Sequence, residues 1–530
     1  VVADVIALDQ YDAPAVALLG VRMPVTSRDR CSTVSSGTAQ AAANGTDVAS
    51  VGLRIPFPGP VRRRRYDPTV ATTPGWAASI PRVEQWIPAA AVPDLGTPAA
   101  ITRAVIIGDC ELATELGAAL SVHVPVQRIA LSHKVTDMPA GFDTSAPVIV
   151  VWPDSPVLDP VPAAGRALRI LQQARTAPRS VIVVLRDRAG LAQSAVAAMV
   201  RTAQTESAHP IRLIWSDGFS PAVLGEAILD RSADEELAIE HTTILRRGFV
   251  PAPTSDGAGV AIAADGTYVV TGALDGLGAV AARWLLDRGA RDIVLLTAIP
   301  RPLPPLLDGC EDRVVVMHCD IADPADLDTA LTDIRACGST IRGLIHTDGP
   351  APVTDTPLIE TPPNETFTEV SADQVIQRIE AARSAIGALL AATACDGLDF
   401  TLLFSSMAAA LGVPGRTGAA AAHSVLDTMA RTSGERRVTS IAWGSWDYGL
   451  TRSDDAAARM RSAGITAFDA ARGMAVLSAV LQRPEPVLLA VDYHPGEYTS
   501  ADSSGDTARL ARRLRQLWQA ATPELSVTAD

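Results

Sequence analysis

Lysine is almost absent from this sequence. Its 530 residues include a single lysine, Lys134, and all other members of the Lys+Arg total of 45 are arginines. The formal net charge is −14, and a protein with such an acidic balance is repelled by nucleic acid and by anionic membrane surfaces. We therefore expect neither nucleic acid nor a membrane among its partners.

The sequence also lacks paired cysteines and long apolar runs. Its six cysteines form no CxxC motif and no Cys/His metal spacing, so we expect reduced thiols, no metal and a cytoplasmic location. No apolar run reaches the length of a membrane span, and no signal peptide opens the chain. Val1 follows no methionine, which indicates a piece of a larger protein.

What the sequence does contain is a repeated strand–helix rhythm. Apolar residues make up 48% and charged residues 20% of the chain, as in soluble α/β proteins. We expect strands at 104–108, 148–152, 181–185 and 212–215, and then at 267–271, 292–296, 314–318, 343–345, 400–404, 439–443 and 487–491. Between and after them we expect helices at 111–120, 163–177, 191–205, 324–336, 371–393, 418–432, 470–481 and 506–521. Alternation of this kind predicts parallel sheets with helices on both faces, here in two Rossmann-like subdomains packed as one body.

The stretch Thr267–Arg288 organises the second of these subdomains. An apolar strand is followed by Thr271-Gly272-x-x-x-Gly276-x-Gly278 and then by a long amphipathic helix. Such a turn lets a dinucleotide pyrophosphate approach the backbone and the helix N-terminus. Asp275, however, places a carboxylate where phosphate oxygens would lie, and like charges at short range repel. The corresponding turn of the first subdomain, at 108–111, has no glycine cluster, so we expect no nucleotide there.

Three later segments carry a family resemblance. Phe404-Ser405-Ser406, the stretch GAAAAHSVLD at 418–427 and AWGSW at 442–446 resemble the ketoreductase domains of modular type I polyketide synthases, which belong to the short-chain dehydrogenase/reductase superfamily. The stretch VRTAQTES at 200–207 resembles the truncated, non-catalytic subdomain of that family. The resemblance covers about residues 80–495.

The resemblance implies a domain plan. Residues 1–79 would be an upstream linker or dimerisation segment, and 80–258 a structural subdomain without cofactor. Residues 259–495 would be the catalytic-type subdomain, and 496–530 a helix and linker toward a carrier domain. The implied partners are an acyl carrier protein with a phosphopantetheine-bound β-ketoacyl intermediate and the neighbouring synthase domains.

The catalytic groups of the family are mostly missing. Ketoreduction needs a donor to the developing alkoxide, which in this family is a tyrosine supported by a serine, a lysine and an asparagine. Ser406 matches the serine, but Ala419 stands at the tyrosine position and His423 at the asparagine position. The lysine should lie within 382–387, where the only basic residue is Arg383.

The cofactor site departs from the family as well. Gly272, Gly276, Gly278 and Asp320, the last in the motif on the adenine side, match the family pattern, whereas Asp275 and Asp348 add carboxylates. NADPH-selective members place an arginine just past the second strand, and here that stretch is Thr297-Ala298-Ile299-Pro300. We therefore expect no bound cofactor.

Two functions of different classes follow from the resemblance. The first is a structural module, a reductase-incompetent (C-type) ketoreductase domain that leaves the β-keto group unreduced. The second is a redox-independent epimerase of the α-methyl group of a carrier-bound 2-methyl-3-ketoacyl thioester. In that reading Ser406 and His423 would supply the base and the enolate stabiliser, and the spacing of one helical turn directs Ala419 and His423 toward the same cleft.

Overall fold

A computed structural model of the protein describes residues 2–8, 14–22, 76–89, 101–108, 110–129, 146–152, 160–174, 180–216, 220–229, 235–254, 259–272, 276–298, 302–338, 340–347, 366–448, 454–495 and 505–519. Two residues that the sequence analysis singled out, Asp275 and Asp348, lie outside these ranges. Over the described part of the chain, no helix is both long and apolar enough to span a membrane.

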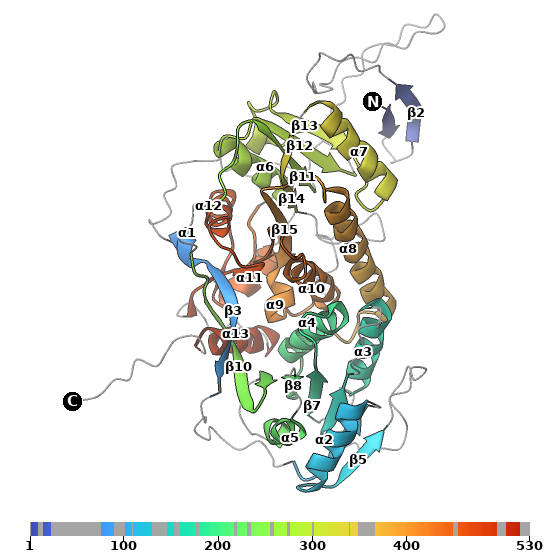
Figure 1. Cartoon of the computed structure of the whole chain (residues 1–530), viewed down its shortest axis with the longest axis vertical. Coiled ribbons are helices and arrows are strands. Elements are labelled where there is room, and N and C mark those ends of the chain that lie inside the picture. Colours follow the sequence, from blue (N-terminus) through green and yellow to red (C-terminus); the bar gives the residue numbers. More distant parts are fainter. Residues whose placement is uncertain are drawn as a thin grey trace, which may run out of the picture.

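A single sheet of 15 strands runs through the molecule (Figure 1). The strands of the second half are all parallel and lie in the order β13 (Val314–His318), β12 (Asp292–Thr297), β11 (Gly266–Thr271), β14 (Thr340–His346), β15 (Phe400–Ser406), β16 (Val438–Trp443) and β18 (Val487–Ala490). Those of the first half are also parallel, in the order β9 (Glu236–Glu240), β8 (Ile211–Ser216), β7 (Val181–Leu185), β6 (Val148–Val151), β4 (Ala104–Ile107) and β5 (Val126–Ile129). In both halves the first strand is flanked by the second on one side and by a later strand on the other, the switch point of a doubly wound fold.

Two antiparallel strands join the halves. β3 (Pro81–Pro88) pairs with β18 on one side and with β10 (Thr243–Pro251) on the other, and β10 pairs with β9. Two small sheets complete the strand inventory: β1 (Val2–Leu8) with β2 (Pro14–Arg22), and β17 (Ile465–Thr466) with β19 (Asp492–Tyr493). The two Rossmann-like halves are therefore one continuous body.

Helices cover both faces of this sheet. The first half carries α2 (Glu111–Ser121), α3 (Pro160–Ala174), α4 (Leu191–Glu206) and α5 (Pro221–Leu229). The second half carries α6 (Leu277–Asp287), η1 (Pro305–Leu307), α7 (Pro324–Ala336), α8 (Ala372–Ala392), α9 (Met407–Leu411), α10 (Thr417–Arg431), α11 (Asp454–Ser462) and α12 (Ala470–Val480). A short α1 (Trp76–Ser79) precedes β3, and α13 (Gly505–Gln519) ends the described chain.

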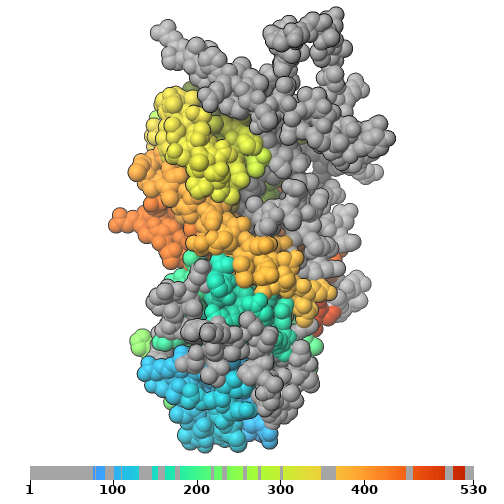
Figure 2. All heavy atoms as spheres, turned by 90° about the vertical axis from the view of Figure 1, so that its right-hand side faces the viewer, coloured from blue at the N-terminus to red at the C-terminus, as the bar shows by residue number. Residues whose placement is uncertain are grey.

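Four helices form the seam between the halves. α10 packs on α4 and α8, and α3 packs on the same two helices. Figure 2 shows the outer side of this arrangement, where α7 (yellow), α8 (orange), α3 (teal) and α2 (blue) follow one another along one face. From Ala192 to Glu206 every residue of α4 is buried, because this helix lies between its own half and the helices of the other. The seam therefore encloses polar residues that a surface helix would expose.

The expected elements are confirmed with shifts of a few residues at their ends. A capping box begins α8, with Ser371 and Gln374 exchanging hydrogen bonds with each other's backbone. Pro251 is the last residue of β10, and the Ala252 amide donates to the Pro81 carbonyl. The strands β3 and β10, which join the halves, and the strand β9 were not expected.

Candidate functional site

The glycine turn lies at the carboxyl end of β11. Gly272 adopts a φ of 136°, which favours glycine, and its amide donates to the Leu296 carbonyl of β12. Gly276 precedes α6, and Gly278 is buried in the first turn of that helix. The strand–turn–helix geometry predicted from sequence is therefore present on both sides of residues 273–275.

The carboxyl ends of β11 and β14 are joined by side chains. His346 Nδ1 lies 2.7 Å from Thr271 Oγ1, and Thr347 Oγ1 donates to the Thr271 carbonyl at 2.9 Å. All three residues are buried. Because β11 and β14 flank the switch point of this half, these bonds fix the spacing of the two strands where a dinucleotide would cross the sheet.

Carboxylates gather beyond β13, on the side where the family binds adenine. The Asp320 amide donates to Asp326 Oδ2 at 2.6 Å, and Asp320 Oδ1 accepts from the Ala322 amide at 2.9 Å. Burial, assisted by Asp326, Asp320 and Asp323, raises the pKa of the Cys319 thiol to about 12. The environment around Asp320 is therefore negative, which disfavours further anions.

Ser406 is the last residue of β15. Its hydroxyl oxygen accepts a hydrogen bond from the Ala408 amide at 3.2 Å and so begins the short helix α9. The neighbouring Ser405 hydroxyl donates to the His423 carbonyl at 3.3 Å. The structure therefore brings α10 against the end of β15, which places Ser406 and the Ala419–His423 turn in one region of the molecule.

Ala419 and His423 lie in the first half of α10 and are both partly exposed. The Nδ1 atom of His423 is itself buried and has no hydrogen-bond partner among the residues that the structure describes. Burial, reinforced by the positive charges of Arg416 and Arg378, lowers the pKa of His423 to about 4. The imidazole is therefore neutral at pH 7 and a weak base.

Two arginines near this site, Arg378 and Arg416, were missed by the sequence analysis. Arg383, the only basic residue in the expected lysine segment, pairs with Glu380 at 2.5 Å, and both side chains are exposed. Arg378 lies one turn before Ala382, and its charge acts on His423. Arg416 is the N-cap residue of α10, the helix that carries His423. No motif marks Arg378, because its effect depends on how α8 packs against α10.

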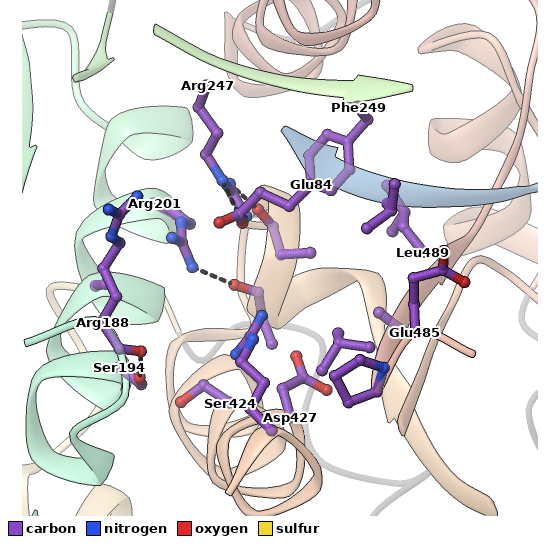
Figure 3. Close-up of a pocket in the computed structure, with 18 of the residues that line it drawn as sticks. Glu84, Arg188, Ser194, Arg201, Arg247, Phe249, Ser424, Asp427, Glu485 and Leu489 are labelled. Carbon is purple, nitrogen blue, oxygen red and sulfur yellow. Dashed lines mark hydrogen bonds and ion pairs between the residues drawn. The ribbon is translucent and has the colours of Figure 1, made fainter. Parts of the chain in front are cut away.

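A cavity of about 330 Å³ lies at the seam between the halves (Figure 3). Its walls combine residues of α10, including Ser424 and Asp427, with Arg201 of α4 and Arg247 of β10. Burial raises the pKa of Asp427, which accepts a hydrogen bond from Ser440 at 2.7 Å. The cavity is on the side of α10 that faces α4 and β3, so it is distinct from the carboxyl edge at Thr271 and His346.

Comparison with known proteins places this architecture in a class and then in a family. Solved structures share the fold: the first ketoreductase of the tylosin PKS superposes with a TM-score of 0.65 at 20% identity, over 84% of this chain and all of that one. A C2-type ketoreductase from a modular polyketide synthase gives a TM-score of 0.63 at 22% identity, over 79% and 96% of the two chains. These likenesses establish a Rossmann-type α/β fold of the short-chain dehydrogenase/reductase kind.

Sequence comparison finds a matching family model and similar proteins. The family model described as KR domain matches residues 266–448. Erythronolide synthase EryA3 of Saccharopolyspora erythraea is 32% identical over 53% of this chain, and polyketide synthase GfsA of Streptomyces halstedii is 32% identical over 62%. The chain spans only 9% and 4% of those two proteins. It contains a ketoreductase-type (KR) domain of the modular polyketide synthase class.

Proposed function

We propose that this KR domain does not reduce ketones and serves a mainly structural role in its synthase, leaving the β-keto group of a carrier-bound intermediate unreduced. The observation that carries the proposal is Ala419 on α10, one turn before His423 and beside the end of β15. A methyl group cannot donate a proton to the developing alkoxide, and a general acid is required there. The resemblance assigns that role to a tyrosine at this position.

The lysine and the asparagine that would support the missing acid are also absent at the positions where the family has them. Ala382 is buried and uncharged at the start of the expected lysine segment, and Arg383 is held at the surface by Glu380. His423 replaces the asparagine that would hold a water relay. Catalytic groups of this kind act as a unit, so their losses compound.

NADPH does not fit the residues at the carboxyl edge. Thr297 ends β12 and is followed by Ala298, so no guanidinium stands at this position to pair with a 2′-phosphate. Asp320, Asp323 and Asp326 make the adenine side negative, as the raised pKa of Cys319 reflects. The sequence adds Asp275 in the glycine turn and Asp348 after β14. We therefore propose that the domain holds no cofactor.

The epimerase alternative has less support. It needs a base that removes an α-proton, and His423 is the candidate. A histidine whose pKa is lowered to about 4 by burial and by Arg416 and Arg378 accepts protons poorly at neutral pH. The proposed substrate and partner, a carrier-bound β-ketoacyl thioester and its acyl carrier protein, are the same for both functions.

The decisive experiment presents a carrier-bound 2-methyl-3-ketoacyl thioester, deuterated at the α-carbon, to the domain with excess NADPH. We expect no alcohol product by mass spectrometry and no deuterium loss beyond the rate without protein. Alcohol formation would disprove the proposal, and accelerated washout without alcohol would establish the epimerase instead. An active ketoreductase domain that accepts the same thioester serves as the positive control.

Cofactor binding is tested separately through tryptophan fluorescence. We expect micromolar NADPH to cause no saturable quenching of the unmodified chain. The double variant Asp275→Gly with Ala298→Arg should gain measurable binding, because it removes a repelling carboxylate and adds a guanidinium for the 2′-phosphate. Saturable quenching of the unmodified protein would contradict the absence of a cofactor.

A further inference from the structure

One buried carboxylate at the seam holds three arginines. Glu236 of β9 is 2% exposed in its side chain and accepts from Arg201 at 2.7 Å, from Arg247 at 3.2 Å and from Arg513 at 3.2 Å. The Trp215 indole donates to the same carboxylate at 3.1 Å. We call Glu236 and its three arginines the Glu236 cluster. Its members come from β9, α4, β10 and α13, and none lies within the matched region 266–448.

Two of these arginines also hold the helix that follows Ser406. Arg201 Nη1 donates to the Ala409 carbonyl at 3.0 Å, and Arg247 Nη1 donates to the Ala410 carbonyl at 2.5 Å. The last carbonyls of a helix have no partners within it, and cations near them are favourable. The Glu236 cluster therefore caps the carboxyl end of α9, whose amino end is capped by Ser406.

The chain after α9 also rests on the first half. Gly412 has a φ of 73°, and a Cβ placed on it would lie 2.2 Å from the Arg201 carbonyl oxygen. Glu206, at the end of α4, accepts from the Gly415 amide at 2.8 Å and from the Phe367 amide at 2.6 Å. The segment 407–415 is therefore attached to α4 at several points.

The third arginine brings the C-terminal helix into the same network. Arg513 of α13 is 3% exposed and donates to Glu235 at 2.7 Å as well as to Glu236. Arg509 donates to the carbonyls of Thr205 and Glu206 at the end of α4. The apolar residues of α13, Leu510, Leu514 and Leu517, belong to the same core cluster as Met407 and Leu411 of α9, and α13 also contacts α11.

We propose that α13 is a positioning element for the Ser406 segment, acting through the Glu236 carboxylate. Arg201 and Arg247 are each shared between Glu236 and a carbonyl of α9. Arg513 neutralises part of the charge on the carboxylate. The guanidinium groups of Arg201 and Arg247 can therefore also donate to the carbonyls of α9. Without Arg513 the unbalanced carboxylate draws Arg201 and Arg247 toward itself, because charge-assisted hydrogen bonds are stronger than bonds to a carbonyl. The end of α9 then loses its cap.

Hydrogen exchange measured by mass spectrometry tests this inference on the full chain. In Arg513→Met we expect amides of 407–416 to exchange about tenfold faster than in the unmodified protein, since local opening there becomes easier. Amides of α6 should be unchanged. Arg512→Met, on the exposed side of the same helix, is the matched control and should exchange like the unmodified protein. These readouts do not depend on any catalytic activity, so they stand apart from the test of the proposed function.

Arg513→Lys separates charge from general stability. It keeps the cation beside Glu236, so we expect it to restore most of the protection of 407–416, and it serves as the test variant if Arg513→Met does not fold. Unchanged exchange of 407–416 in folded Arg513→Met would overturn the inference. So would acceleration spread equally over α6 and α9, or a folded Arg513→Lys that exchanges as fast as Arg513→Met.

Discussion

At the residue scale, the clearest electrostatic effect is the lowered pKa of His423. Its Nδ1 atom is buried and finds no hydrogen-bond partner within the described part of the chain, and burial with the charges of Arg416 and Arg378 lowers its pKa from 6.5 to about 4. Because the folded pKa is depressed, the stabilising contribution is fully present above pH 6.5 and is lost as the pH falls through about 4.

We expect an NMR titration to place the His423 pKa near 4, and Arg416→Met to raise it toward 6.5. Between pH 6.5 and pH 4 the free energy of unfolding should fall less in His423→Gln than in the unmodified chain. The difference should be about 1–3 kcal/mol. Denaturant unfolding of the variant and the unmodified chain at each pH checks this. An unperturbed pKa for His423 would contradict the burial of its ring.

Repair of the lost catalytic groups should be cumulative. Ala419→Tyr alone, or with His423→Asn, should leave a β-ketoacyl thioester unreduced, since hydride donor and lysine are still missing. We expect detectable alcohol only after Asp275→Gly, Asp348→Ala, Ala298→Arg and a lysine near Ala382 are added. The readout is product mass with excess NADPH. Reduction by Ala419→Tyr alone would mean that the cofactor site is intact.

At the residue scale the sequence predicted positions but not environments. Ser406, Ala419 and His423 were identified through the family resemblance, and the structure places them at the junction of β15 and α10. The charge of Arg378 could not be assigned to His423, because the approach of α8 to α10 is a tertiary contact. The buried roles of Arg201 and Arg247 were hidden for the same reason.

At the element scale, α9 and its following turn depend on close contact with α4. Gly412→Ala should lower the free energy of unfolding by about 2–5 kcal/mol, since a positive φ is strained and the new methyl meets backbone. Gly434→Ala is the matched control: its φ of 67° carries the same strain, but nothing lies within 4 Å of the new Cβ. We expect it to cost about 1–2 kcal/mol. Equal losses in urea unfolding would show that packing on α4 is unimportant.

The elements that the sequence predicted are those with a simple apolar pattern. β6 and β7 are continuous apolar runs buried on both faces, as expected of central parallel strands. β3 and β9 were missed because their sequences, PRVEQWIP and ELAIE, mix apolar and charged residues. The charged positions Glu84 and Glu236 are tolerated there because Arg247 pairs with both, and a local pattern does not contain that partner.

For the whole molecule, the continuous sheet and shared helices predict one cooperative unfolding transition at neutral pH. Calorimetry should give a single peak whose van't Hoff and calorimetric enthalpies agree. Two resolved transitions would instead mean that the halves unfold independently.

Acid should destabilise the ion pairs at the seam between the two halves. Burial alone would raise the pKa of Glu84, but Arg247 and neighbouring arginines bring it down to about 2, and the pKa of Glu236 is likewise depressed. The stability from these carboxylates is present above pH 4.5, their ordinary value, and is lost as the pH falls toward 2. The melting temperature should therefore fall steeply in this window. A shallow decline, with the seam intact by hydrogen exchange, would contradict the prediction.

The pairing of β3 with β18 also brings the first strand of this domain next to one of its last strands. Pro81 is the register partner of Ala490, and α13 packs against β10, the other neighbour of β3. The strand β3 and the helix α13, far apart in sequence, therefore lie side by side (Figure 1). A pulling force applied through β3 and α13 would act on the short pairing of β3 with β18. It would not act on the carboxyl edge of the sheet. This arrangement keeps β3 and α13 close together through contacts such as Arg82 over the Trp518 ring, whether or not the domain is catalytically active.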